Sequence, residues 1–304
     1  MSPLHNPLLA ALLSALLAAA FAACAPLEQR PAGAAFALFG DAPYSQAHAN
    51  LLEAVIDEMN AEPVVFAVHL GDITSGTGPC SDQWLEARQR QFARIRHPLV
   101  LVFGDNEWTD CHRSGFEPME RLGKLRTLFH SRDPQLPRFG RQSRVYPEHT
   151  RWVAADTLFV TLNVPGSNNN LGRTPDMDAE HAARMEAVFG WLEDAVSLAE
   201  APGITALVVL MHANPNFEGA PARPGQADGY ARLRDVLQSH ARRLNKPLVV
   251  AHGDTHRYKH DRPMREASGL IRIEVDGWPA LGWLVVRRVP GAGEPLSVER
   301  RLLH

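Results

Sequence analysis

Apolar, strand-like runs in this chain end repeatedly in a short segment that carries a metal-type ligand. Five such runs occur in order, at residues 35–39, 64–70, 99–103, 207–211 and 248–251. The segments that follow them are Gly40-Asp41, Gly71-Asp72, Gly104-Asp105-Asn106-Glu107, His212 and Gly253-Asp254-Thr255-His256. Open α/β sheets bind their ligands at the carboxyl ends of the strands, and a glycine there allows a tight turn. Five such ends in one chain therefore favour a single metal centre.

Helical periodicity connects the first three runs. Residues 45–60 place apolar side chains on one stripe, and residues 82–95 and 118–129 have the same pattern. The resulting order β-α-β-α-β predicts a mostly parallel sheet in the first half of the chain, and an α/β fold.

The second half of the chain is expected to supply a second sheet. Its predicted elements are strands at 152–154 and 157–162, a polar loop at 165–178, and helices at 179–199 and 230–244. Runs at 271–275 and 281–288 flank Asp276-Gly277 and are predicted to pair antiparallel, with 296–303 beside them. These C-terminal strands, within residues 269–304, are expected to complete the second sheet.

Bulk composition is that of an ordinary globular protein. The chain has 304 residues, of which 45% are hydrophobic and 21% charged, and its net charge of −3 follows from 31 basic and 34 acidic residues. One large α/β domain is the simplest organisation at this length. No block of Lys and Arg stands out, so no nucleic-acid partner is predicted.

The order of the polar segments resembles that of the calcineurin-like metallophosphoesterase superfamily. That family carries Asp-x-His, Gly-Asp, Gly-Asn-His-Glu/Asp, a lone His and Gly-His-x-His in this order, and the resemblance covers roughly residues 35–260. It implies a four-layer αββα sandwich, in which two mixed β-sheets are flanked by helices, and a centre of two divalent metal ions. Carried over by position, the implied metal ligands are Asp41, Asp72, Asp105, His212, Asp254 and His256. Asp72 would bridge the two ions.

Three of the segments depart from the family pattern. Asp41-Ala42-Pro43 lacks the His two residues after the Asp, and Asp254 replaces the first His of Gly-His-x-His. Asp105 stands where the family has its Asn ligand, and Asn106 stands where it has a His that contacts substrate. If this segment is aligned to the family motif with a shift of one residue, Asn106 becomes the ligand instead. Either His252 or Tyr44 could fill a vacant position from the side.

Charge constrains which metal such a site would hold. Asp41, Asp72, Asp105 and Asp254 would supply four carboxylates, which balance two divalent ions and leave little positive charge for an anionic ester. A trivalent iron, or the nearby arginines Arg113, Arg173 and Arg257, would restore it. Oxygen-rich ligands favour manganese, iron or magnesium over zinc.

The resemblance implies a metal-dependent phosphoesterase that acts on a small-molecule phosphate ester. A water or hydroxide activated at the two metal ions would attack the ester, and Asn106 would orient the substrate as the catalytic residue. An alternative is a protein of the same fold that binds metal as a binding or scaffold lipoprotein, without turnover. The missing histidines discriminate between these two hypotheses, because an active enzyme must compensate for their loss and a binding protein need not.

The amino terminus resembles an export leader. Residues 8–23 are apolar, and Phe21-Ala22-Ala23-Cys24 resembles the signal of a bacterial lipoprotein, whose cysteine is lipidated. Residues 1–24 would then be the leader, 25–34 a tether and 35–304 the phosphoesterase domain. Ala25 after Cys24 implies a periplasmic protein anchored in the outer membrane by this lipid. Simple secretion with cleavage near Cys24 is the alternative.

Two further cysteines remain for an oxidising compartment. Cys80 and Cys111 follow the second and third ligand segments closely. A disulfide between them is predicted to tie together the loops that carry Asp72 and Asp105, and two buried thiols are the alternative.

Overall fold

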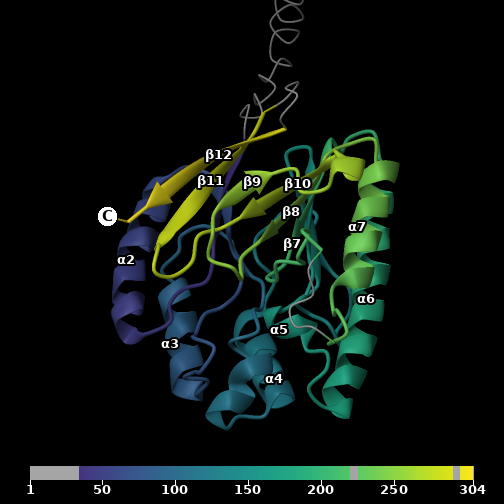
Figure 1. Cartoon of the computed structure of the whole chain (residues 1–304). Helices are drawn as coiled ribbons and strands as arrows, with labels where there is room; N and C mark the ends of the chain where they lie inside the picture. The colour runs from purple at the N-terminus through teal and green to yellow at the C-terminus, as the bar shows by residue number, and fades with distance from the viewer. Residues whose placement is uncertain (1–33, 220–224, 290–294, 304) are drawn as a thin grey trace, which may run out of the picture. The chain divides into compact units, whose positions relative to one another are not determined.

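Two mixed β-sheets lie face to face, with helices on the outer face of each (Figure 1). The computed structural model describes residues 34–219, 225–289 and 295–303, within the unit Gly33–His304. The predicted leader, Cys24 and residues 25–33 of the tether lie outside the described residues. The predicted four-layer αββα sandwich is confirmed. Within the described ranges, no helix combines the length and the apolar character that crossing a bilayer requires.

The first sheet has five strands in the order β12-β11-β1-β2-β3. Strands β1 (Ala35–Phe39), β2 (Val64–His69) and β3 (Leu99–Leu101) are parallel, as the β-α-β-α-β pattern predicts. Strand β11 (Gly282–Arg288) pairs antiparallel with β1, and β12 (Leu296–Leu302) pairs antiparallel with β11. The helices α2 (Gln46–Ala61), α3 (Asp82–Phe92) and α4 (Pro118–Phe129) share one apolar cluster with this sheet.

The second sheet has seven strands in the order β4-β5-β6-β7-β8-β10-β9. Its parallel centre consists of β6 (Thr157–Thr161), β7 (Ala206–Leu210), β8 (Leu248–His252) and β10 (Leu270–Glu274). Its antiparallel edges are β4 (Gly140–Arg141), β5 (Thr150–Ala154) and β9 (Lys259–Asp261). Helices α6 (Pro175–Ala199) and α7 (Ala231–Arg243) pack on its outer face.

Alternate side chains of the central strands divide between two layers of core. In β1, Leu38 points to the apolar layer between the sheets, whereas Phe39 packs with the helices of the first sheet. In β7, Val208 and Leu210 point to the same central layer. The central strands are therefore buried on both faces, which explains why they appear in the sequence as continuous apolar runs.

The predicted pairing of the C-terminal strands is wrong. Strand β10 lies in the second sheet beside β8, whereas β11 and β12 lie in the first sheet beside β1. Both β10 and the first five residues of β11 are buried. Because both strands are apolar along their buried lengths, either sheet could bury them, and the chain crosses from one sheet to the other at 275–281 rather than forming a hairpin. The predicted placement of 296–303 beside 281–288 is confirmed, and these two strands are antiparallel.

The predicted polar loop at 165–178 is partly helical. Residues Gly166–Asn169 form the short element α5, and α6 begins at Pro175, because Thr174 caps it by accepting a hydrogen bond from the Met177 backbone N–H.

Candidate metal centre

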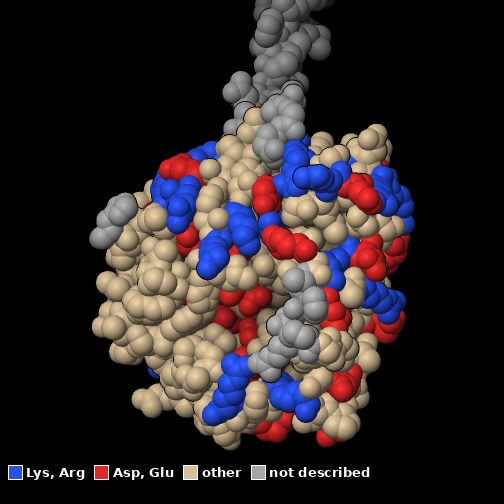
Figure 2. All heavy atoms as spheres, in the orientation of Figure 1, with Lys and Arg blue, Asp and Glu red and all other residues tan. Residues whose placement is uncertain are grey.

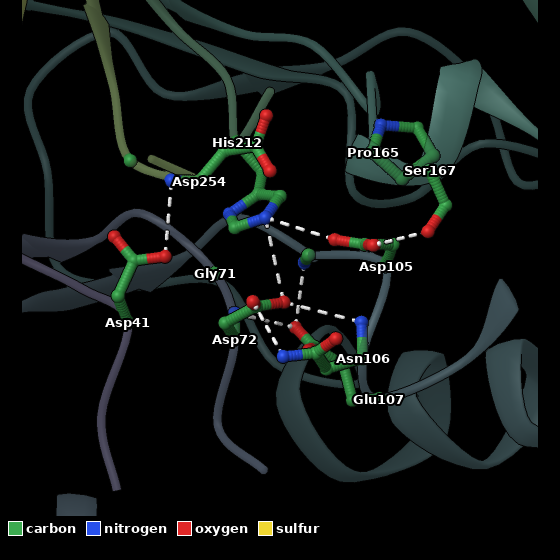
Figure 3. A network of polar contacts seen from close by, with 12 residues as sticks. Asp41, Gly71, Asp72, Asp105, Asn106, Glu107, Pro165, Ser167, His212 and Asp254 are labelled. Carbon is green, nitrogen blue, oxygen red and sulfur yellow. Dashed lines mark hydrogen bonds and ion pairs between the residues drawn. The ribbon is translucent and has the colours of Figure 1, made fainter. Parts of the chain in front are cut away.

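The carboxyl ends of strands from both sheets meet at one place (Figure 3). In the first sheet, Asp41, Asp72 and Asp105 follow β1, β2 and β3. In the second sheet, His212 follows β7, and residues 254–256 follow β8. The fold therefore brings together ligands that are up to 215 residues apart in the sequence, from Asp41 to His256.

Two groups of three side chains can each hold a metal ion. The first is Asp41, Asp72 and His256, and the second is Asp72, Asp105 and His212, with the ligand atoms of each group within 4.8 Å of one another. Asp72 belongs to both groups, as expected of a carboxylate that bridges two ions. Asp254 lies beside them, where its backbone N–H donates to Asp41 Oδ1 and its Oδ2 accepts from the Asn214 N–H.

Backbone carbonyls orient both imidazoles. His212 Nδ1 lies 2.8 Å from the Leu70 carbonyl oxygen, and His256 Nδ1 lies 2.8 Å from the Trp278 carbonyl oxygen. Because a carbonyl can only accept, each Nδ1 carries the proton and Nε2 is left as the ligand atom. His212 Nε2 is 3.1 Å from Asp105 Oδ1 and 3.4 Å from Asp72 Oδ1. This is the usual arrangement of a metal-binding histidine.

The electrostatics of the cluster favour a bound cation. Burial raises the pKa of Asp41 to about 8 and that of Asp254 to about 7. Burial lowers the pKa of His212, but the charges of Asp72 and Asp105 outweigh it and raise that pKa well above its ordinary value. Asp41 Oδ2 is buried without a hydrogen-bond partner. Metal ions would neutralise these groups and satisfy that oxygen, so the donor set fits two ions.

Strained backbone aims the ligands. Asp41, Asp72, Asp254 and His256 have φ values of 50°, 61°, 79° and 61°, in the left-handed region that non-glycine residues rarely occupy. Each such residue costs on the order of 1–3 kcal/mol and persists only where surrounding structure fixes it. Four of the six predicted ligands are therefore held in conformations that the local sequence alone does not favour.

A model of the family described as calcineurin-like phosphoesterase matches residues 36–258 of this chain. The chain belongs to the calcineurin-like phosphoesterase family. It is therefore a metallophosphoesterase, a hydrolase that acts on phosphoester bonds.

Two solved structures resemble this phosphoesterase in fold. A dimetal phosphatase from Danio rerio aligns with a TM-score of 0.60 at 16% identity, over 88% of this chain and 96% of that one. The purple acid phosphatase PPD1 from yellow lupin (Lupinus luteus) seeds aligns with a TM-score of 0.52 at 13% identity, over 89% of this chain and 52% of that one. A comparison with curated proteins gave no match.

Asn106 contacts the carboxylate of Asp72, which both ligand groups share. Its backbone N–H donates to Asp72 Oδ1 at 3.1 Å, and its side-chain Nδ2 donates to Asp72 Oδ2 at 2.6 Å and to the Thr74 carbonyl at 3.0 Å. Asp105 lies in the second ligand group, whereas the Asn106 amide donates its N–H groups to Asp72 and Thr74. The predicted catalytic role of Asn106 stays a prediction, and these contacts also make it a positioning residue for Asp72.

The Glu107 carboxylate and a disulfide hold together the loops that carry Asp72 and Asp105. Glu107 Oε1 accepts the backbone N–H groups of Asp72 and Gly104, which fixes one loop against the other. Only glycine fits at 104, because a Cβ there would overlap the Asp72 carboxylate. The predicted disulfide is confirmed: Cys80 and Cys111 are bonded, with their Cα atoms 5.7 Å apart, and they join the same two loops.

Ser167 is a site residue that sequence reasoning missed. Its hydroxyl lies 2.7 Å from Asp105 Oδ2 and 2.7 Å from Asp110 Oδ2. It therefore occupies one oxygen of Asp105 and leaves Oδ1, the oxygen that faces His212, for an ion. An asparagine ligand likewise offers one oxygen, so Asp105 with Ser167 would present a single free oxygen as the carboxamide of the family pattern does.

A left-handed turn presents Ser167. Residues 167–170 have φ values of 48°, 58°, 57° and 67° in succession. The fully buried Arg184 holds this turn, donating from Nη1 to Asn169 Oδ1 at 2.7 Å and from Nη2 to the Asn169 carbonyl at 3.0 Å. The run Asn168-Asn169-Asn170 was the available sequence signal, because asparagine tolerates this conformation better than other non-glycine residues.

Replacing Ser167 with alanine is expected to weaken binding of the second ion by roughly 10–100-fold, the usual cost of losing a partner that orients a ligand. Binding of the first ion should be unaffected. Titration of the metal-free protein with Mn²⁺ measures both affinities, and Ser197→Ala, on the exposed face of α6, is the control. An unchanged second affinity would refute this role.

A cavity of about 800 Å³ adjoins the second ligand group. Its lining includes Asp254, Asn214, Ser167 and the two arginines Arg113 and Arg173. Figure 2 shows acidic atoms at the floor of a hollow on this face, with basic side chains on its lower rim. Of the three arginines predicted to compensate the carboxylates, Arg113 and Arg173 line the cavity, whereas Arg257 is exposed and lies outside its lining.

Proposed function

We propose that this phosphoesterase hydrolyses a small-molecule phosphate ester at a centre of two metal ions. The observation that carries the proposal is that two ligand groups, each formed at the carboxyl ends of strands from both sheets, share the buried carboxylate of Asp72. The proposed ligands are those predicted from the sequence: Asp41, Asp72, Asp105, His212, Asp254 and His256. Manganese, iron or magnesium suits these oxygen-rich groups better than zinc.

The bound ions would supply an activated water and charge neutralisation for the ester. The other roles fall to the chain itself. Asn106 would orient the ester while it holds Asp72, and Arg113 and Arg173 on the cavity wall would attract the phosphate that a nearly neutral centre draws weakly. Ser167 keeps Asp105 as a one-oxygen ligand.

We further propose that the enzyme is exported and held at the periplasmic face of the outer membrane by a lipid on Cys24. The observation in support is the confirmed Cys80–Cys111 disulfide, because such bonds persist in oxidising compartments.

Hydrolysis is expected to depend strongly on the leaving group. No imidazole stands at position 106 to protonate a departing alkoxide, and such a proton donor contributes roughly 10²–10⁴-fold. We therefore expect kcat/KM for p-nitrophenyl phosphate to exceed that for a simple alkyl phosphate by at least about 10²-fold. Asn106→His should narrow this difference.

The measurement uses protein loaded separately with Mn²⁺, Mg²⁺ or iron, and includes bis(p-nitrophenyl) phosphate to separate monoesterase from diesterase activity. Failure to hydrolyse any of these esters with two ions bound would refute the enzyme proposal. It would favour the alternative of a metal-stabilised binding protein.

A further inference from the structure

The cavity beside the second ligand group has a wall of carboxamide side chains. Five of its lining residues are Asn or Gln, namely Asn168, Asn170, Asn214, Asn216 and Gln226. We propose that this wall binds the leaving group of the substrate, and that the leaving group is a sugar or polyol rather than a nucleoside or an aryl group. The inference rests on the proposed function, because it names the class of phosphate ester that the same centre would hydrolyse.

Two of these carboxamides hold the cavity in shape. Asn168 donates to two backbone carbonyls and accepts a backbone N–H. Asn170 donates to Glu180 Oε2 at 2.8 Å and accepts a hydrogen bond from Arg173. Both side chains are therefore occupied by contacts within the chain, and neither is assigned to the ligand.

The other three carboxamides keep hydrogen-bonding groups for a ligand. Asn214 Oδ1 accepts the Asn216 backbone N–H at 3.0 Å, and Gln226 Nε2 donates to the Leu171 carbonyl at 3.4 Å. Within the described part of the chain, no partner is bonded to Asn214 Nδ2, to Gln226 Oε1 or to either polar atom of the Asn216 side chain. These atoms include both donors and acceptors. Hydroxyl groups need this combination, because each one both donates and accepts.

The wall begins at the metal centre. Asn214 follows the proposed ligand His212 by two residues, and its backbone N–H donates to Asp254 Oδ2 at 3.0 Å. An ester whose phosphate bound the ions would therefore place its leaving group against this wall. The cavity volume of about 800 Å³ suits such a group, since pockets that enclose a small ligand measure roughly 300–1,000 Å³.

The same cavity offers little surface for a flat ring system. Among the described residues that line it, Tyr230 is the one Phe, Tyr or Trp, and it is only 6% exposed. Its hydroxyl donates to the Pro165 carbonyl at 2.9 Å and accepts the Asn169 N–H at 2.9 Å, so this side chain belongs to the framework. Nucleobases bind by stacking on exposed aromatic faces, and aryl groups need apolar walls. The lining therefore favours a polyhydroxylated leaving group.

The test compares esters whose leaving groups are all primary alkoxides, on protein loaded with Mn²⁺. We expect kcat/KM for the best of glucose 6-phosphate, ribose 5-phosphate and glycerol 3-phosphate to exceed that for ethyl phosphate by about 10–10³-fold. Each of the three free carboxamides can add one hydrogen bond between neutral groups, which is worth roughly 2–10-fold. Adenosine 5′-phosphate should be no better than ribose 5-phosphate, which differs from it by lacking the base.

Two substitutions assign this preference to the wall. Asn216→Gly suits the φ of 54° at this position, and Gln226→Ala removes the acceptor oxygen. Each is expected to lower the ratio of the sugar-phosphate kcat/KM to the ethyl phosphate kcat/KM by roughly 2–10-fold. A purely structural role would lower both values and leave their ratio unchanged. Gln83→Ala, on an exposed position of α3, is the matched control and should keep the ratio.

Calorimetric titration of the loaded protein with the same phosphates separates this inference from the proposed function. Tighter binding of a sugar or polyol phosphate than of ethyl phosphate, without hydrolysis of any ester, would support the wall and refute the enzyme. Hydrolysis of p-nitrophenyl phosphate with equal kcat/KM values for ethyl phosphate and the sugar phosphates would refute the wall alone. A preference for adenosine 5′-phosphate over ribose 5-phosphate, or a ratio unchanged in both variants, would also overturn it.

Discussion

Replacing Asp72 with alanine is expected to reduce bound metal from near two equivalents to below one, and to lower phosphoester hydrolysis by more than about 10³-fold. Asp72 is the one side chain common to both ligand groups, and it is buried. Loss of a single group that stabilises charge in a transition state already costs roughly 10²–10³-fold. The substitution removes a ligand from both ions at once, so the effect should exceed that range.

Elemental analysis and p-nitrophenyl phosphate hydrolysis measure the two effects on the same preparation. Asp235→Ala, on an exposed position of α7, is the matched control and should retain two equivalents and full activity. Asp105→Ala should lose only the second ion, because Asp105 belongs to one group. If Asp72→Ala kept two equivalents of metal, the shared-carboxylate arrangement would be wrong.

Removing the disulfide is expected to lower the free energy of unfolding by about 3.5–4 kcal/mol. Cys80 and Cys111 are separated by 31 residues, and closing a loop of this length restricts the unfolded chain by about that amount. The bond also joins the loops that carry Asp72 and Asp105, so the second ion should bind more weakly in the Cys80→Ala/Cys111→Ala variant.

Denaturant unfolding of wild type and the double variant, both free of metal, isolates the disulfide from the contribution of the ions. A reducing agent should lower the stability of wild type to that of the double variant and leave the double variant unchanged. Equal stabilities of the oxidised wild type and the variant would contradict the expected contribution.

Local chemistry made most of the first half of the fold predictable. Helix α4 has the predicted bounds, and β1 to β3 are parallel as predicted, because apolar periodicity and short connections determine these elements locally. The disulfide was likewise predictable, because Cys80 and Cys111 each follow a ligand segment closely. The C-terminal strands were not, since an apolar run does not specify which sheet buries it.

The candidate metal centre was likewise predictable only in part. The identity and order of the ligand candidates follow from the sequence alone, because a polar residue after a buried strand must lie at the strand's carboxyl end. Which side chains face the ions depends on backbone angles and distant contacts. Asp105 lies in a ligand group and Asn106 donates to Asp72, while the Tyr44 hydroxyl also reaches Asp72. Ser167 reaches Asp105 only because Arg184, on another helix, holds a strained turn.

The sequence by itself determined the family, the ligand types and the two layers of strands that carry them, because each depends on residues that are neighbours in the chain. Only the tertiary structure decided which oxygen and nitrogen atoms converge. Left-handed residues such as Asp41 and Asp72 are unfavourable locally, and contacts with residues far away in the sequence hold them in place.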